Sequence, residues 1–173
     1  QMNYWLAENC NLSETSLILS HFMQKIAEAG KFTAKEMYGT NGWTIHHLTD
    51  PFGRTGAADG VWGITPMNGP WMTFPVYEHF LFTRDTSYLK NIAYPLLKGS
   101  AEFVLGFITK SPEGFLVTNP SHSPENEFHD QIKKQKSSLT YAATIDIEIA
   151  NALFDYCSEA AEILNTDKEF VKM

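Results

Sequence analysis

The chain has 173 residues, of which 43% are hydrophobic and 19% charged, and its formal net charge at pH 7 is -7. These values are typical of one folded domain with a sizeable core, and they exclude a disordered chain. An acidic chain repels phosphate backbones, so nucleic-acid binding is not expected, and no apolar run reaches membrane-spanning length.

The first part of the chain predicts two helices followed by a long loop. Ser13 supplies a capping oxygen, apolar residues follow it at helical spacing, and Gly30 is the kind of residue that ends a helix. A second, short helix is expected over residues 32–38 and is closed by Gly39. Residues 40–70 are rich in Gly, Pro, Asn and Asp, and loops of this length inside compact domains usually carry function.

The remainder predicts further helices around a second polar loop. Helical periodicity covers residues 71–85 and 86–109, where Pro95 is expected to kink or restart the helix. Residues 114–121 predict a short strand that leads into the polar stretch NPSHSPENEFHD. A long amphipathic helix is predicted over residues 140–165, and Thr166 is expected to cap another helix. The apolar stripe of the long helix consists of Ile145, Ile149, Leu153 and Cys157.

This order of elements predicts an all-α fold made of paired helices. There is no βαβ alternation and no GxGxxG, P-loop or HExxH motif, and the distant Cys10 and Cys157 match no zinc spacing. We therefore expect no cofactor and no metal, while the redox compartment stays open. Helical hairpins whose polar loops emerge at one end form a toroid or a solenoid, with any chemistry on those loops.

Glu125 is the candidate acid of the second loop. Pro124 has a fixed φ and biases Ser123 toward extended geometry, so the glutamate is expected on a stiff turn. A general acid must stay in one place and keep its proton near neutral pH, which favours a rigid loop beside aromatic side chains. The structural alternative is that Glu125 or Glu127 caps the next helix or is simply solvated.

The first loop offers polar and aromatic candidates for sugar binding. His46, His47 and Asp50 are suited to hydrogen-bonding a polyol, because imidazole both donates and accepts; the alternative is a histidine satisfied by backbone groups. Adjacent residues of an extended segment point in opposite directions, which argues against a shared metal. Trp62 and Trp71 are candidate stacking platforms for a pyranose, although core packing is the ordinary role of a tryptophan.

Several separate motifs together give the chain a family likeness. The stretches QMNYWLAENCNLSE, GWTIHHLTD, WGITPMNGPWMTFPVYEHFLFTRD, YPLLKGSAEFVLGFI and LVTNPSHSPEN occur in this order and cover nearly the whole chain. Together they resemble the inverting α-L-fucosidases that act on α-1,2-linked fucose. The resemblance implies a six-hairpin (α/α) barrel that binds a glycan at its loop end, and it makes Glu125 the general acid. The family's HHNTD segment corresponds here to His46, His47, Thr49 and Asp50, with Leu48 in place of the asparagine.

The resemblance also implies that residues 1–173 are about half of an (α/α)6 barrel, cut at both ends. In the family, two asparagines of an N-x-N motif before QMNYW and an aspartate far downstream activate the water. We therefore expect the acid in this chain and the base in the remaining half of the barrel. A secreted or periplasmic location is compatible with the family, while the sequence itself leaves the compartment open.

Three other functions stay open at this stage. An α-L-galactosidase on the same barrel would differ by one sugar hydroxyl, which a hydrophobic pocket rejects only weakly. A non-catalytic carbohydrate-binding or assembly fragment would expose the apolar faces of a half toroid. A glycoside phosphorylase would need a cation near the acid, and the first lysine after Glu125 is Lys133.

Overall fold

A computed structural model describes residues 2–173, and it is mostly helical. The long helices are α1 (Ser13–Tyr38), α2 (Asn68–Thr83), α4 (Tyr94–Phe107) and α5 (Thr144–Leu164). Shorter helical segments are η1 (Met2–Tyr4), η2 (Gly60–Gly63), α3 (Thr86–Tyr88), η3 (Leu89–Ala93) and α6 (Lys168–Val171). The predicted all-α class is confirmed.

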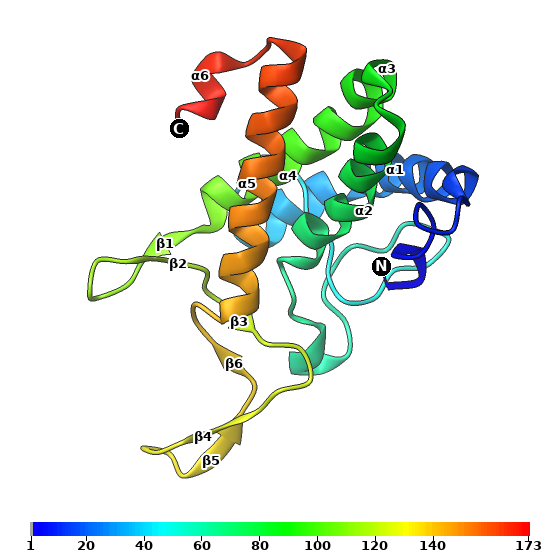
Figure 1. The fold of residues 1–173 in the computed structure, drawn as a ribbon. Coiled ribbons are helices and arrows are strands. Elements are labelled where there is room, and N and C mark those ends of the chain that lie inside the picture. The colour runs from blue at the N-terminus through cyan, green and yellow to red at the C-terminus, as the bar shows by residue number, and fades with distance from the viewer. Residues whose placement is uncertain (1) are drawn as a thin grey trace.

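The four long helices pack against one another (Figure 1). α1 contacts α4, α2 contacts α5, and the two pairs also contact each other through α1 with α2, α2 with α4, and α4 with α5. Long helices that follow one another in sequence, α1 with α2 and α4 with α5, thus pack together, as expected of helical hairpins in a toroid. None of the helices in residues 2–173 combines the length and the apolar character that a membrane crossing requires.

The core lies among the long helices and the first loop and contains large apolar side chains. The largest fully buried ones include Trp43, Tyr77, Phe80 and Phe103. Burying one such side chain stabilises the fold by about 1.5–3 kcal/mol. The Trp43 indole also donates a hydrogen bond to the carbonyl oxygen of Leu96 at 3.0 Å, so the first loop is tied directly to α4.

The expected end of the first helix at Gly30 is wrong, because α1 continues to Tyr38. Gly30 instead lies against the backbone of Thr44, whose N–H donates to the Gly30 carbonyl at 3.3 Å. A Cβ at position 30 would lie 2.6 Å from the Thr44 oxygen, so only glycine allows this approach. The end at Gly39 is confirmed, since this residue is left-handed with φ 66° and its N–H donates back to the last turn.

The predictions made for Pro95 and for Thr166 have different outcomes. The kink or restart expected at Pro95 is found as a change of helix type: the π-helical turn η3 ends at Ala93, and the proline lies in the first turn of α4. The cap at Thr166 is wrong, because Asp167 is the residue before α6. The Thr166 N–H instead donates to the Ala161 carbonyl at 3.0 Å and so helps to close α5.

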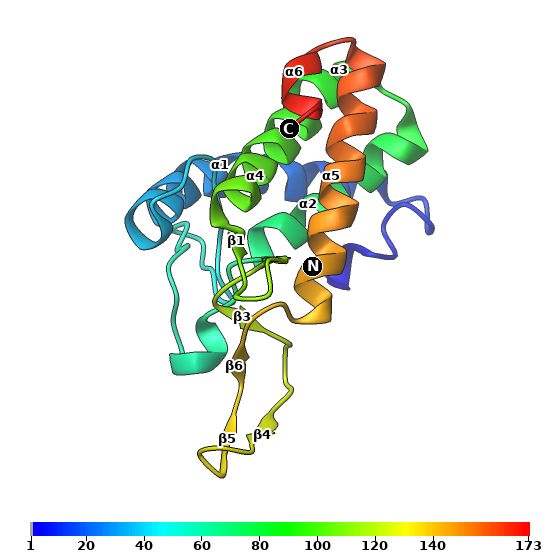
Figure 2. The ribbon, with the colours of Figure 1, turned by 90° about the vertical axis from the view of Figure 1, so that its left-hand side faces the viewer.

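Six short strands form three antiparallel pairs. They are β1 (Thr109–Lys110) with β2 (Leu116–Val117), β3 (Ser121–His122) with β6 (Leu139–Thr140), and β4 (Phe128–Asp130) with β5 (Gln135–Ser137). The predicted strand contains β2, whereas the hairpin of β4 and β5 was not predicted. Both views place β3 to β6 and the loop with η2 at the same end of the molecule (Figures 1 and 2).

Candidate active site

Two loops meet at this end through an aromatic contact. Trp62 comes from η2 in the first loop, and His122 comes from β3 in the second. Their rings lie edge to face with centroids 5.3 Å apart. Trp62 keeps 39% of its surface exposed, so one part of the indole contacts His122 while another remains open to a ligand.

Glu125 lies on the tight turn that follows His122. The Asn126 N–H donates to the Ser123 carbonyl at 3.1 Å, and the Asn126 side-chain amide donates to Ser123 Oγ at 2.9 Å and to the Pro124 carbonyl at 3.0 Å. Glu125 itself has φ 59°, a left-handed conformation that costs a non-glycine residue about 1 kcal/mol or more. The turn is thus held by Asn126, and it presents an exposed carboxylate.

His122 is a site residue that the sequence pattern did not single out. The side chain is buried, and neither ring nitrogen has a hydrogen-bond partner within residues 2–173. Burial lowers the pKa of this imidazole, and the nearby His47 lowers it further, so the ring is neutral at physiological pH. Buried polar atoms are nearly always paired, so His122 marks a place where an outside polar group is expected.

Thr65 and His122 line the same small cavity, together with Trp71, Pro124 and Asp146. The Thr65 hydroxyl is also buried without a partner among the described residues. The free volume of about 10 Å³ suits one water molecule or one hydroxyl group. Trp71 therefore comes close to Pro124 of the Glu125 turn, and it is half-buried on α2. Its role as a platform stays a prediction.

Trp71 also lines a second, wider groove. This groove has a volume of about 350 Å³ and is mainly aromatic. Its other aromatic lining residues are Trp5, Phe74, Tyr77 and Tyr156. Trp71 thus lines both the small cavity at Pro124 and an aromatic surface along α2 and α5.

His46 and His47 point to opposite sides, as expected for neighbours in an extended segment. His46 is fully buried; the Thr65 N–H donates to its Nδ1 at 3.0 Å, and its Nε2 lies 3.0 Å from the Tyr38 hydroxyl. Burial lowers its pKa from 6.5 to about 4, so the ring is neutral and Nε2 carries the proton. His46 therefore links the first loop to α1, whereas His47 is exposed at the surface.

Asp50 shapes the loop that follows the histidines. Its Oδ1 accepts hydrogen bonds from the Phe52 N–H at 2.8 Å and from the Arg54 N–H at 3.3 Å. A carboxylate that bonds backbone groups two and four residues ahead stabilises a turn. Only one of its oxygens is used in this way, and the side chain is half-buried.

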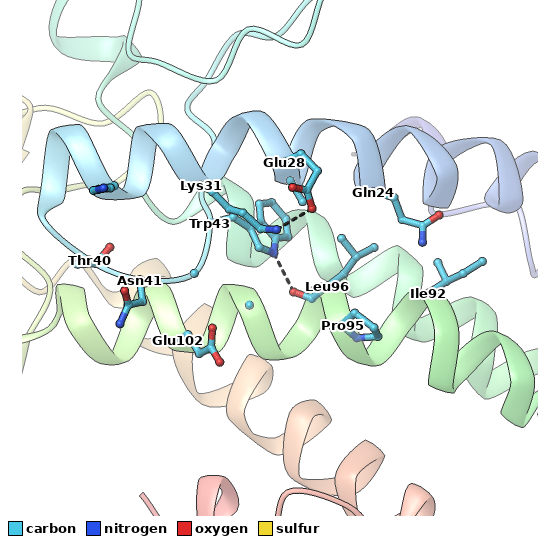
Figure 3. Close-up of a pocket in the computed structure, with 14 residues that line it drawn as sticks. Gln24, Glu28, Lys31, Thr40, Asn41, Trp43, Ile92, Pro95, Leu96 and Glu102 are labelled. Atoms are coloured by element: carbon cyan, nitrogen blue, oxygen red, sulfur yellow. Dashed lines mark hydrogen bonds and ion pairs between the residues drawn. The ribbon is translucent and has the colours of Figure 1, made fainter.

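A larger groove, of about 410 Å³, lies between α1 and α4 and is also lined by the first residues of the first loop (Figure 3). Its floor is apolar and includes Trp43 and Leu96, and its rim carries charged residues such as Glu102 and the exposed pair of Lys31 and Glu28. None of the site residues predicted from the sequence lines it. The loop end therefore remains the candidate active site, because it brings together Trp62, Trp71 and the Glu125 turn.

The comparisons of this chain with known proteins agree on one family. The model of the glycosyl hydrolase family 95 catalytic domain matches residues 1–173. Alpha-L-fucosidase 2 of Arabidopsis thaliana is 39% identical over 166 residues, which are 95% of this chain and 20% of that protein. The probable alpha-fucosidase A of Aspergillus niger is 34% identical over 132 residues, which are 73% of this chain and 17% of that protein. The chain thus spans about a fifth of the length of these relatives.

Proposed function

Because the chain belongs to the family of glycosyl hydrolase family 95 catalytic domains, we propose that it carries the acid half of an inverting α-L-fucosidase site. The substrate is a glycan with a terminal α-1,2-linked fucose, and Glu125 is the general acid. The observation that carries this proposal is the exposed Glu125 carboxylate on a turn held by Asn126. In the same segment, His122 packs against Trp62, and His122 and Pro124 line a small cavity with Trp71. The names of both relatives support the choice of sugar.

In this proposal, hydrolysis proceeds in one displacement. Glu125 gives its proton to the glycosidic oxygen as the bond from that oxygen to the anomeric carbon breaks. A water molecule attacks the anomeric carbon from the opposite face, and a base takes the water's proton, so the configuration inverts. The acid and the base must lie roughly 6.5–9.5 Å apart to admit the water. By family likeness, the base belongs to residues outside the 173 of this chain.

The neighbouring residues have binding roles in this proposal. Trp62 and Trp71 offer flat apolar faces to the C–H faces of the sugar. His47 and the free oxygen of Asp50 are available to its hydroxyls, while His46 acts by holding the loop against α1. We further propose that residues 1–173 form part of an (α/α)6 barrel whose other hairpins complete the pocket.

The decisive experiment is Glu125→Gln in the full-length protein that contains this chain. Natural fucosylated oligosaccharides have poor leaving groups and need the proton, so we expect their kcat to fall by at least about 100-fold. Fucosyl fluoride needs no proton, and its hydrolysis should fall far less. Glu127→Gln, a change of the neighbouring exposed acid, is the matched control and should leave both rates nearly unchanged. An equal loss on both substrates in the Glu125 variant would give this residue a binding role instead.

A further inference from the structure

Asp146 is a buried carboxylate in the first turn of α5, with only 4% of its surface exposed. Its Oδ2 accepts hydrogen bonds from Ser121 Oγ at 2.6 Å and from Thr118 Oγ1 at 3.1 Å. Within residues 2–173, no lysine, arginine or histidine forms a salt bridge with it. Burying a carboxylate without a cation is costly, so its two hydroxyl partners are its main compensation.

These two hydroxyls belong to the segment that leads into the Glu125 turn. Ser121 begins β3, is fully buried, and its Oγ also accepts a hydrogen bond from the Ala143 N–H at 2.9 Å. The Thr118 carbonyl accepts a hydrogen bond from the Ala142 N–H at 3.0 Å. The start of α5, the two residues before it and the segment from Thr118 to Ser121 are therefore joined through one buried network.

The network ends four residues before Glu125. Beyond Ser121, the chain continues through His122, which packs against Trp62, into the turn held by Asn126. The pairing of β3 with β6 sets the register there, with Ser121 opposite Thr140 and His122 opposite Leu139. The Glu125 turn thus follows a segment that is held by the Trp62 contact, by the pairing of β3 with β6 and by the hydrogen bonds to Asp146 of α5.

We propose that Asp146 is a positioning residue for the general acid: by holding Ser121 and Thr118, it fixes where the Glu125 turn lies relative to Trp62. This inference rests on the proposed function of Glu125. Proton transfer requires the donor and acceptor atoms to lie within about 2.6–3.2 Å. A displacement of about 1 Å at an active site costs up to about 100-fold in rate.

A purely structural role for Asp146 predicts a different result. A carboxylate in the first turn of a helix is stabilised by the helix dipole. Its loss would then lower the stability of α5 and reduce all activities together. A misplaced acid, in contrast, slows only the substrates that need its proton. The dependence on leaving group therefore separates the two roles.

The test uses Asp146→Ala in the full-length protein, assayed on a natural fucosylated oligosaccharide and on fucosyl fluoride. We expect kcat on the oligosaccharide to fall by about 10–100-fold and the fluoride rate by less than about 3-fold. Ser121→Ala should lower the ratio of the oligosaccharide rate to the fluoride rate in the same way, but by a smaller factor. Asp146→Asn should restore most of the oligosaccharide rate, because an amide oxygen can accept both hydroxyl hydrogen bonds.

Cys157→Ala provides the matched control, and each variant is also melted thermally. Cys157 is buried on the same helix about 16 Å away along its axis, so its loss weakens α5 packing without touching the Thr118–Ser121 segment. It should lower the melting temperature and leave the ratio of the two rates unchanged. Equal loss on both substrates in Asp146→Ala and Ser121→Ala would overturn the inference. If Asp146→Ala does not fold, Ser121→Ala and Thr118→Val decide alone.

The control Glu125→Gln keeps the two proposals apart. If that variant distinguishes the two substrates and the Asp146 and Ser121 variants do not, the positioning role is wrong and the function of Glu125 stands. If Glu125→Gln does not distinguish them, the function assigned to Glu125 is wrong, and the positioning role is overturned with it.

Discussion

At the scale of single residues, His46 shows how burial decides what a histidine does. Both of its nitrogens are engaged inside the protein, one by the Thr65 N–H and the other by the Tyr38 hydroxyl. Protonation would put a second N–H where the Thr65 N–H now donates, and it would place a charge in the core. The neutral form is therefore the one that the folded protein requires.

This requirement predicts a loss of stability in acid. The His46 pKa is lowered from 6.5 to about 4 by burial, so the unfolded chain binds the proton first as pH falls. The contribution of His46 to the free energy of unfolding is fully present above pH 6.5. It falls progressively toward pH 4, by about 3 kcal/mol in total. We therefore compare the free energies of unfolding of wild type and His46→Gln in urea. The difference in favour of wild type should shrink by about 2 kcal/mol between pH 7 and pH 4.5.

Replacing the neighbouring histidine is the control for this prediction. His47→Gln removes an exposed imidazole from the same loop, and it should not reproduce the effect. If the difference in free energy of unfolding between wild type and His46→Gln stays constant across this pH range, the assigned neutral state of His46 is wrong.

The candidate site was only partly predictable from the sequence, and the reason is physical. The family resemblance singles out Glu125, and the long polar loop singles out Trp62 as a candidate; both assignments stay predictions. His122 and Asp146 stand out only through burial and through the presence or absence of partners, which depend on segments far away in the chain. His46 belonged to the same motif as His47, and only the packing of the loop separated their environments.

At the scale of elements, periodicity predicted the long helices, but it did not predict where glycine ends one. Gly39 ends α1 because nothing faces it and its φ of 66° suits glycine, whereas Gly30 stays helical because the Thr44 backbone packs on it. The difference lies in a tertiary contact, which the local pattern does not encode. The β4–β5 hairpin was missed for a related reason: its polar sequence has no alternating apolar face.

The contact at Gly30 gives a prediction of its own. Alanine is a better helix former than glycine by about 1 kcal/mol, so Gly30→Ala would stabilise an isolated helix. In the folded chain, however, its Cβ would lie 2.6 Å from the Thr44 oxygen, and the loop that carries His46 must move. We expect a net destabilisation of about 1–3 kcal/mol, measured as a lower urea midpoint. Gly56→Ala, where a Cβ meets nothing within 4 Å, should be nearly neutral.

At the scale of the whole molecule, the packed helices leave apolar surface uncovered. An apolar groove of about 300 Å³ is lined by Leu105, Phe154, Phe170 and their neighbours, and the aromatic groove at Trp71 lies beside α2 and α5. Several large apolar side chains are also exposed, among them Phe32 and Phe115. Patches of this kind usually mark surfaces that another element covers. In the proposed barrel, the covering elements are the remaining hairpins.

The behaviour of the 173-residue chain on its own tests this picture. Expressed alone, it should associate or precipitate, because its grooves lack their covering hairpins, and it should release no fucose, because the proposed base lies elsewhere. Size-exclusion chromatography with light scattering gives the first result, and an assay of fucose release from a fucosylated oligosaccharide gives the second. The full-length protein, handled identically, should show well-defined assembly and turnover. A soluble, monomeric chain would contradict the half-barrel proposal, and robust turnover would show that the base lies within these residues.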